Sequence, residues 1–336
     1  MGEILSKIET ASDPRTVASY FRPRLVSYTL GYATMQYRLR NLSKQIKKVR
    51  DLEQKSEWLL IVLDACRFDR FDKMFDTFFE GSVEPIASAG YNTFEYVRKV
   101  WPDQHNITYV TGAAPINASK FEISDEMELQ GISAKNERLK QRYQDYRPAD
   151  HIEDIVEVWR SEWDEELGVC PPEPVTRTAI EEAESENQIV AHYFQPHVPY
   201  IGDERALTDL DNIDERLRGG AIGHGIWSRA RNGDIDRDRL LELYDSNLKR
   251  ALENVCHLIE NTNFDSVAIM GDHGEALGEY GIYGHPERPH PYTREVPWAV
   301  IDSVKEAPEL DYDRTDSEAS DVEPTVQDRL ETLGYI

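Results

Sequence analysis

Short apolar segments recur along the chain, and each is followed by polar or turn-forming residues. The first, residues 58–63, is a continuous apolar run of strand length, which is typical of a central parallel strand covered on both faces. The same pattern predicts four further strands, within residues 106–112, 187–200, 267–270 and 295–302. Helix-prone segments separate them, the clearest being 237–262. Strands that alternate with helices predict an α/β fold, with a mainly parallel central sheet and helices on both faces.

The domain organisation follows from the same pattern. Residues 1–56 are predicted as a helical N-terminal extension, with Pro23 and Gly31 as breaks. Residues 57–302 form the predicted catalytic domain, in which the charged, helix-prone segment 120–186 covers the sheet. Residues 203–236 combine charge with glycine and are predicted to be a lid or insertion, and 303–336 an acidic tail ending in a short helix.

Composition and charge limit the kinds of molecule that the protein is expected to bind. The chain has 336 residues, 40% of them hydrophobic, so it can bury a large core. Its 63 acidic residues outnumber its 38 basic ones, which gives a formal charge of −25, and only 12 of the basic residues are Lys. This acidity disfavours nucleic acid as a partner. It predicts a halophilic protein from a salt-loaded cytoplasm; an acidic protein from an ordinary cell is the alternative.

The N-terminal extension is the one basic section of the chain. It carries Arg15, Arg22, Arg24, Arg38, Arg40, Lys44, Lys47, Lys48 and Arg50. Two interpretations stay open. The first is a helix pair docked on the acidic body. The second is a peripheral contact to an anionic membrane surface or a partner.

Cysteine usage and the N-terminus bear on the compartment. Cys66, Cys170 and Cys256 are far apart and form neither a disulfide framework nor a zinc ribbon, which fits a reducing compartment. The N-terminus has no apolar signal-peptide region, and no segment approaches the roughly 18–20 apolar residues of a membrane-spanning helix. We therefore expect a cytoplasmic protein with no integral membrane segment.

Candidate metal ligands stand at the ends of three predicted strands: Asp64, His197 and the Asp272–His273 pair. Ligands of open α/β sheets bind at the carboxyl ends of the strands. Carboxylate oxygen and imidazole nitrogen both suit zinc or manganese. The alternative for the GDHGE stretch is a turn whose glycines permit tight geometry and whose charges face water. Three strand ends with metal-type residues favour the metal site.

A hydrolase built on this metal needs a nucleophile, and the candidates are Ser88, Thr93 and Cys66. Thr93 lies where a loop is predicted to become a helix, so its hydroxyl would lie near backbone N–H donors and a cation would lower its pKa. The same N–H groups could hold a phosphate or sulfate oxygen. The alternative for Thr93 is an ordinary helix N-cap.

Several motifs, in order, resemble one known family. They are "IVLDACRFD", "YNTFEY", "FQPHVPY", "GDHGEALGEYGIYGHP", "VPWAVI" and a closing "RLETLGYI". The chain resembles the sulfatase-like branch of the alkaline phosphatase superfamily over roughly residues 57–302 and the last helix. The most specific motif is GDHGE, followed by a Gly-His pair whose His lies twelve residues after His273. The resemblance implies an alkaline phosphatase-like fold.

The resemblance also implies roles for individual residues. Asp64, Thr93, Asp272 and His273 match the metal ligands, and Thr93 also matches the nucleophile of a two-step displacement with a covalent intermediate. His197 matches a histidine that contacts the transferred group or protonates the leaving group. His285 matches a position near the substrate or a second metal. The cofactor is a divalent ion (Zn, Mn, Mg or Ca), with one firm site and a second one uncertain.

Three functions remain open at this stage. The first is a hydrolase or transferase of phosphate or sulfate esters, with a small-molecule, glycan or lipid ester as substrate. The second is a true sulfatase on sulfated glycans. True sulfatases convert a Cys to formylglycine, but Cys66 follows Asp64 too closely to match that loop, and we interpret it as a buried thiol. The third is a non-catalytic scaffold that keeps the fold. The sequence does not indicate the oligomeric state.

Overall fold

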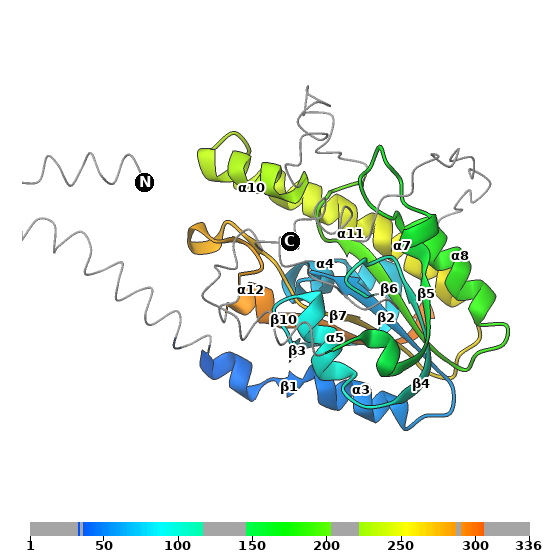
Figure 1. The fold of residues 1–336 in the computed structure, drawn as a ribbon. Coiled ribbons are helices and arrows are strands. Elements are labelled where there is room, and N and C mark those ends of the chain that lie inside the picture. The colour runs from blue at the N-terminus through cyan, green and yellow to red at the C-terminus, as the bar shows by residue number, and fades with distance from the viewer. Residues whose placement is uncertain (1–32, 34–35, 117–145, 203–221, 287–289, 306–336) are drawn as a thin grey trace, which may run out of the picture.

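The computed structural model describes residues 33, 36–116, 146–202, 222–286 and 290–305, and Figure 1 shows their arrangement. An eight-stranded sheet has the order β1-β3-β10-β7-β2-β6-β4-β5. In chain order the strands are β1 (Ser43–Lys44), β2 (Trp58–Asp64), β3 (Phe79–Ala87), β4 (His105–Thr111), β5 (Ile152–Glu157), β6 (Gln188–Pro196), β7 (Val267–Gly271) and β10 (Glu295–Val304). A separate hairpin pairs β8 (Ala276–Leu277) with β9 (Tyr283–Gly284).

Helices connect and cover these strands. They are α3 (Gln45–Glu53), α4 (Phe68–Phe78), α5 (Thr93–Val100), α7 (Val158–Ser161), α8 (Pro172–Glu182), α10 (Ile222–Asn232), α11 (Arg237–Glu260) and α12 (Pro291–Arg294), with 3₁₀ turns η1 (Pro148–Asp150) and η3 (Glu279–Gly281). Helices α4, α8 and α11 lie on one face of the sheet and α3 and α5 on the other (Figure 1). The predicted helix at 237–262 is confirmed as α11.

The prediction of a mainly parallel α/β sheet is confirmed. β7, β2, β6, β4 and β5 run parallel, whereas β10 is antiparallel to both β7 and β3. All five predicted strands form. The sequence pattern missed β1, β3 and β5. β1 has only two residues, β3 carries exposed polar residues and a proline along most of its length, and β5 lies at the sheet edge with charged side chains exposed.

The central strand β2 divides the core into two layers. Leu59, Ile61 and Leu63 pack toward α4, α8 and α11, while Leu60 and Val62 pack toward α3 and α5. Because side chains alternate along a strand, Asp64 continues the second set and faces α5. This alternation decides on which face of the sheet the candidate site forms.

The N-terminal residues within the described part of the chain belong to this core. Val49 and Leu52 of α3 share a cluster with β2. Basic side chains of the same segment pair with acidic ones: Arg38 with Glu295, Lys48 with Glu84, and Arg50 with Glu53. The described part of the basic segment is therefore docked on the acidic body, and the predicted helix pair as a whole stays a prediction. A membrane or partner contact remains a prediction, since residues 1–32 lie outside the described residues.

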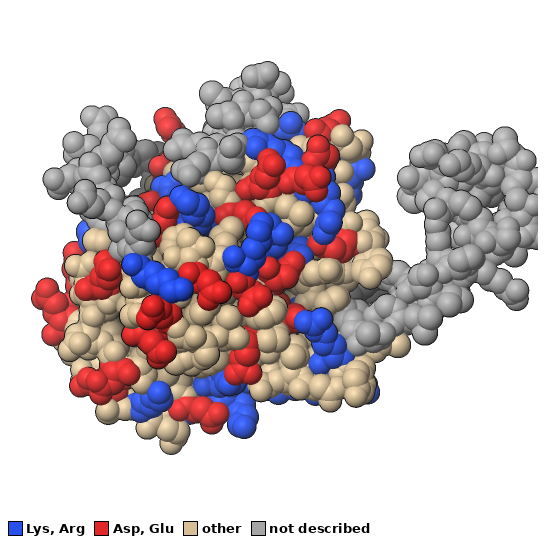
Figure 2. All heavy atoms as spheres, turned by 180° about the vertical axis from the view of Figure 1, so that it is seen from behind, with Lys and Arg blue, Asp and Glu red and all other residues tan. Residues whose placement is uncertain are grey.

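Other predictions concern the surface and the remaining segments. In the predicted lid, residues 222–232 form α10, and 203–221 lie outside the described residues, as do the tail residues 306–336. On the face shown in Figure 2, acidic and basic side chains are interspersed. Among the described helices, none combines the length and the hydropathy needed to cross a bilayer. The domain boundaries, the halophilic origin and the cytoplasmic location stay predictions.

Candidate metal and nucleophile site

The sheet order brings the predicted ligands together. β7 and β6 flank β2 on either side and run parallel to it, with Leu63 opposite Gly271. The residues that follow these strand ends therefore meet at one edge of the sheet. Asp64 ends β2, Asp272 and His273 follow β7, and His197 follows β6.

Thr93, on helix α5, lies beside these residues. It is the first residue of α5, and its Oγ1 lies 2.9 Å from Asp272 Oδ2 and 3.2 Å from Asp64 Oδ2, either of which can accept its single proton. His273 Nε2 lies 3.2 Å from Asp64 Oδ1 and 3.5 Å from Asp272 Oδ2. Asp64, Thr93, Asp272 and His273 are all fully buried. We call these four residues the carboxylate centre.

The carboxylate centre fits a divalent cation. A tetrahedral zinc with bonds of about 2.0–2.2 Å has ligand atoms about 3.3–3.6 Å apart. The contacts among the four side chains, 2.9–3.5 Å, lie close to this range. Two buried carboxylates side by side also need positive charge, because burial without it is costly. The residues present therefore fit a metal ion by both distance and charge.

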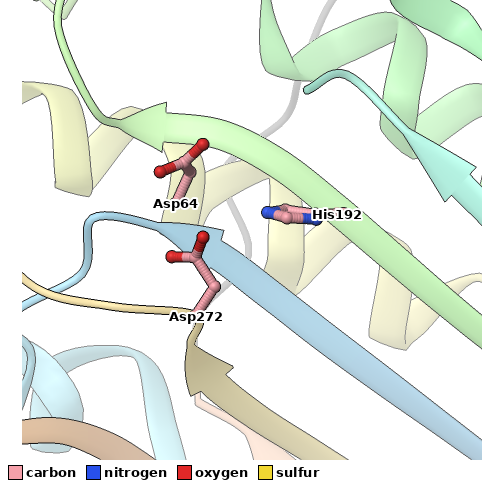
Figure 3. Close-up of side chains that lie close together, drawn as sticks. All are labelled: Asp64, His192 and Asp272. Carbon is pink, nitrogen blue, oxygen red and sulfur yellow. The ribbon is translucent and has the colours of Figure 1, made fainter. Parts of the chain in front are cut away.

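The structure adds a fifth donor that sequence analysis missed. His192 lies within β6, opposite Val62 of β2, and is fully buried. One ligand atom from each of Asp64, His192 and Asp272 lies within 4.8 Å of the others, and Figure 3 shows the imidazole edge turned toward the two carboxylates. A histidine within an apolar strand was the available signal, but the sequence did not reveal which strands are its neighbours.

Tyr109 orients this fifth donor. The Tyr109 hydroxyl and His192 Nδ1 are 2.9 Å apart, while His192 Nε2 has no hydrogen-bond partner among the described residues. Burial lowers the pKa of His192 to about 4, so the ring is neutral. In the tautomer that donates its Nδ1 proton to Tyr109, Nε2 presents a lone pair to the carboxylate centre. Outer-shell hydrogen-bond partners fix the tautomer of metal-binding histidines in the same way.

The N-cap interpretation of Thr93 is wrong. The cap of α5 is Asn92, whose side chain accepts from the Glu95 N–H at 2.9 Å. Because Asn92 already caps the helix, the Thr93 hydroxyl is directed to the carboxylates instead. It remains beside the N-terminal end of α5, where backbone N–H groups favour an anion.

The interpretation of GDHGE as a water-facing turn is also wrong. Asp272, His273 and Glu275 are fully buried. The glycines allow close backbone approach: a Cβ on Gly271 would lie 2.5 Å from the Cys66 carbonyl oxygen, and one on Gly274 would lie 2.1 Å from that of Tyr292. The stretch is therefore tightly packed between neighbouring loops rather than exposed to solvent.

The backbone beside Asp64 is strained. Ala65 has φ of +59°, a left-handed conformation that non-glycine residues rarely adopt. In this conformation its N–H donates to Asp272 Oδ1 at 3.0 Å, and its carbonyl accepts from the Tyr244 hydroxyl at 2.8 Å. Such strain persists where surrounding contacts maintain it, commonly at functional sites. Here the strained backbone at Ala65 fixes the Asp272 carboxylate next to that of Asp64.

A pair of histidines lies beside the carboxylate centre. His197 Nε2 and His285 Nε2 are 3.3 Å apart, and the rings of His273 and His285 lie 4.6 Å apart between centroids. His197 is held by its own backbone, whose N–H donates to the Asp64 carbonyl at 3.1 Å and whose carbonyl accepts from Asn247. All six residues predicted for the site thus meet at one edge of the sheet.

Burial and charge affect the carboxylate centre in opposite ways. Burial and the neighbouring Asp64 raise the pKa of Asp272 to about 7. Burial would also raise the pKa of Asp64, but the His273 imidazole, 3.2 Å away, and the other nearby imidazoles hold it well below its usual range. Burial alone would lower the pKa of His273, yet Asp272 and Asp64 raise it to about 9. Without a metal, a protonated His273 balances the carboxylates.

The other two candidate nucleophiles are poorly suited to attack. The Ser88 hydroxyl donates to the Gly90 carbonyl at 2.8 Å and accepts from Arg294 at 3.0 Å, so it is part of the loop structure. Cys66 is a fully buried free thiol, as predicted, and burial together with Asp272 raises its pKa well above the usual value. Of the three, only Thr93 directs its side-chain oxygen into the carboxylate centre.

Comparison with known proteins gives similar shapes. No protein-family model and no curated protein sequence matches the chain. Among solved structures, the soluble domain of lipooligosaccharide phosphoethanolamine transferase A from Neisseria meningitidis is 15% identical, covers 77% of this chain and 76% of its own, and has a TM-score of 0.42. The C-terminal periplasmic domain of phosphoethanolamine transferase EptC from Campylobacter jejuni is 14% identical, with coverages of 73% and 78% and a TM-score of 0.42.

A third solved structure is BT1596, a 2-O GAG sulfatase. It is 10% identical, with coverages of 74% of this chain and 64% of its own, and has a TM-score of 0.45. All three are enzymes by name. Similarity at this level carries no argument about chemistry, because one fold hosts many activities. The function is therefore argued from the residues of this chain.

Proposed function

We propose that this protein is a metal-dependent hydrolase or transferase of phosphate esters that acts through a covalent intermediate on Thr93. One observation supports this most strongly: the Thr93 hydroxyl, at the N-terminus of α5, lies 2.9 and 3.2 Å from two buried carboxylates that converge with His273. Asp64, Thr93, Asp272 and His273 would hold the metal, with His192 as a further donor. A divalent cation there would supply the positive charge that lowers the pKa of the hydroxyl.

The reaction has two displacements. In the first, Thr93 Oγ1 attacks phosphorus, the bond from phosphorus to the leaving alcohol breaks, and the Thr93 proton is lost to the surrounding bases. In the second, the oxygen of water or of an acceptor alcohol attacks the phosphothreonine and releases Thr93. The backbone N–H groups at the start of α5 stabilise the negative oxygens of the transferred group.

The paired histidines suit proton transfer at the leaving and attacking oxygens. Burial lowers the pKa of His197, and burial, together with the other imidazoles, lowers that of His285 far below the usual value. Neutral imidazoles can accept a proton from the attacking water, and a protonated ring can donate one to the leaving alcohol. His285 and His197 act as a pair because their Nε2 atoms face each other.

The alternatives have less support. A true sulfatase would need Cys66 in the nucleophile loop, but Cys66 follows Asp64, the last residue of β2, by only two residues, whereas Thr93 begins α5. A non-catalytic scaffold does not account for two buried carboxylates and a hydroxyl within hydrogen-bond distance. If these groups had no function, apolar residues could replace them, because such replacements of buried charged groups are often neutral or stabilising.

The proposal is tested with purified protein and three sets of aryl esters: phosphate monoesters, phosphodiesters and sulfate esters. Each is assayed with zinc, manganese, magnesium or calcium, at low and high salt. We expect cation-dependent cleavage of phosphate esters and one bound cation per chain. Sulfate ester cleavage alone would favour the sulfatase, and absence of both turnover and a stoichiometric cation would favour the scaffold.

A further inference from the structure

Gln45 links the N-terminal segment to the candidate site. The short edge strand β1 pairs with the last residues of β3, with Ser43 opposite Ile86 and Lys44 opposite Ala87. The next residue, Gln45, therefore lies where the chain leaves β3 toward Thr93. Gln45 is the first residue of α3 and is fully buried, although long amide side chains are mostly exposed in proteins.

The Gln45 amide bridges two loops. Its Nε2 donates to the Gly271 carbonyl at 2.7 Å and lies 3.3 Å from that of Asp272. Its Oε1 accepts from the Ala89 N–H at 2.8 Å. Exchanging the amide oxygen and nitrogen would place an acceptor against carbonyls and a donor against an N–H, so these partners fix its orientation. One side chain thus connects the loop after β3 with the loop after β7.

These two loops carry the two halves of the site. The first leads from Ala89 to Thr93, and the second carries Asp272 and His273. Thr93 Oγ1 on the first loop lies 2.9 Å from Asp272 Oδ2 on the second, so the position of the nucleophile depends on the spacing between the two loops that Gln45 connects. On the opposite side, the segment before β10 also braces both loops, since Ser88 N donates to Arg294 O at 2.8 Å and Gly274 N to Thr293 O at 3.0 Å.

We infer that Gln45 is a positioning residue that sets the spacing between Thr93 and the metal-binding pair Asp272–His273. The N-terminal helix α3 is then part of the catalytic unit rather than an accessory extension. Outer-shell groups of this kind typically change metal affinity or activity by 10–100-fold when removed. The catalytic part of this inference rests on the proposed function; the bracing of the two loops does not.

Gln45→Met is the test variant, because methionine has similar length and keeps the apolar contacts but cannot pair with the Ala89 N–H or the Gly271 carbonyl. Gln54→Met is the matched control: the same substitution at the other end of α3, where the side chain is exposed. Three quantities are measured in the full-length protein. They are kcat and KM for an aryl phosphate ester, the affinity for zinc or manganese, and amide hydrogen exchange of the metal-free protein.

For Gln45→Met we expect kcat to fall about 10–100-fold with little change in KM, and cation affinity to fall by a similar factor. Amides of residues 88–95 and 271–275 should exchange about tenfold faster, together, while those of α11 keep their wild-type rates. Gln54→Met should match the wild type in every quantity. A merely structural role would lower the melting temperature and raise exchange throughout, with kcat and cation affinity unchanged below the transition, and would overturn the inference.

The exchange experiment separates this inference from the proposed function. If the wild type neither binds a cation nor cleaves an ester, the proposed function fails. Faster exchange of both loops in Gln45→Met would then still support the brace. Unchanged exchange in both loops would overturn it whatever the activity of the wild type.

Discussion

The carboxylate centre and the histidine pair lie side by side at one edge of the sheet, yet burial acts on them differently. In the carboxylate centre, mutual contact keeps charge inside the protein: Asp64 stays ionised and the pKa of His273 is raised to about 9. In the pair, burial dominates and lowers the pKa of His197 and His285. His197 is as buried as the carboxylate centre and His285 is half-buried, so exposure alone does not explain the difference.

The difference lies in which charges are neighbours. His273 contacts two carboxylates, whereas His197 and His285 contact each other, and His285 also contacts His273. In the proposed function, the first environment suits a bound cation and the second suits neutral bases that can exchange protons. Each of the following experiments changes one group and asks whether the other responds.

Removing the nucleophile should have the largest effect. Thr93→Ala should lower kcat by several orders of magnitude, because a covalent nucleophile is lost. Thr93→Ser keeps the hydroxyl and should retain measurable turnover. Mass spectrometry after rapid quenching with a slow substrate should place the phosphoryl group on the peptide that contains Thr93.

Cys66→Ser serves as the control for Thr93→Ala. The thiol is buried, so this change should cost some stability and leave most of the activity. An active Thr93→Ala protein together with an inactive Cys66→Ser protein would mean that the thiol, or formylglycine derived from it, performs the attack.

His285→Ala tests whether the histidine pair is separate from the carboxylate centre. We expect kcat to fall about 10²–10⁴-fold, the usual range for a lost general acid or base. Cation affinity, measured by calorimetric titration, should change by less than about tenfold, which is less than the roughly 10–100-fold loss typical when an outer-shell partner of a metal ligand is removed. Loss of the cation in this variant would show that His285 belongs to the metal site instead.

A substitution at Glu275 tests how burial changes the pKa of a carboxyl group that lacks a close counter-charge among the described residues. Burial raises its pKa to about 8, from an ordinary value near 4.5. An acid whose folded pKa is raised contributes stability at low pH and loses it as pH rises through the folded value. In metal-stripped protein, Glu275→Gln should therefore become progressively more stable than wild type between about pH 4.5 and 8, by at most about 1.4 kcal/mol per pH unit. Thermal unfolding at several pH values would give the comparison; a constant difference would contradict it.

Salt should have the smallest effect on the site and act mainly on the surface. The chain carries a formal charge of −25, so its melting temperature should fall at low ionic strength, where self-repulsion is least screened. Cation affinity of the buried centre should respond less. A melting temperature that is the same in dilute buffer and in molar KCl would remove the argument for a salt-adapted surface.

The apolar pattern predicted the central part of the fold well. The runs that became β2 and β7 are almost wholly apolar, and those in β6 and β10 are mostly apolar. The candidate residues Asp64, His197 and Asp272 stand where β2, β6 and β7 stop. β3 escaped prediction because its mixed polar sequence resembles a loop. The antiparallel direction of β10 depends on how the chain returns to the sheet, which local periodicity does not encode.

The site was predicted through residue types at strand ends, but its neighbours were not. Asp64, Asp272 and His273 stand where an apolar run stops, so position and chemistry coincide. Gln45 lies at the start of a helix, where nothing local marks it, and His192 has only the weak signal of a histidine inside a mostly apolar strand. Their roles follow from strand order and from the pairing of β1 with β3, which are long-range properties of the fold.

The most direct test of the account is the location of the metal in crystals grown with zinc, measured by anomalous diffraction at the zinc edge. The account predicts one strong peak about 2.0–2.3 Å from the ligand atoms of Asp64, Thr93, Asp272 and His273, and its loss in Asp272→Asn. A zinc peak bound elsewhere, with these four side chains paired only to one another, would contradict the account.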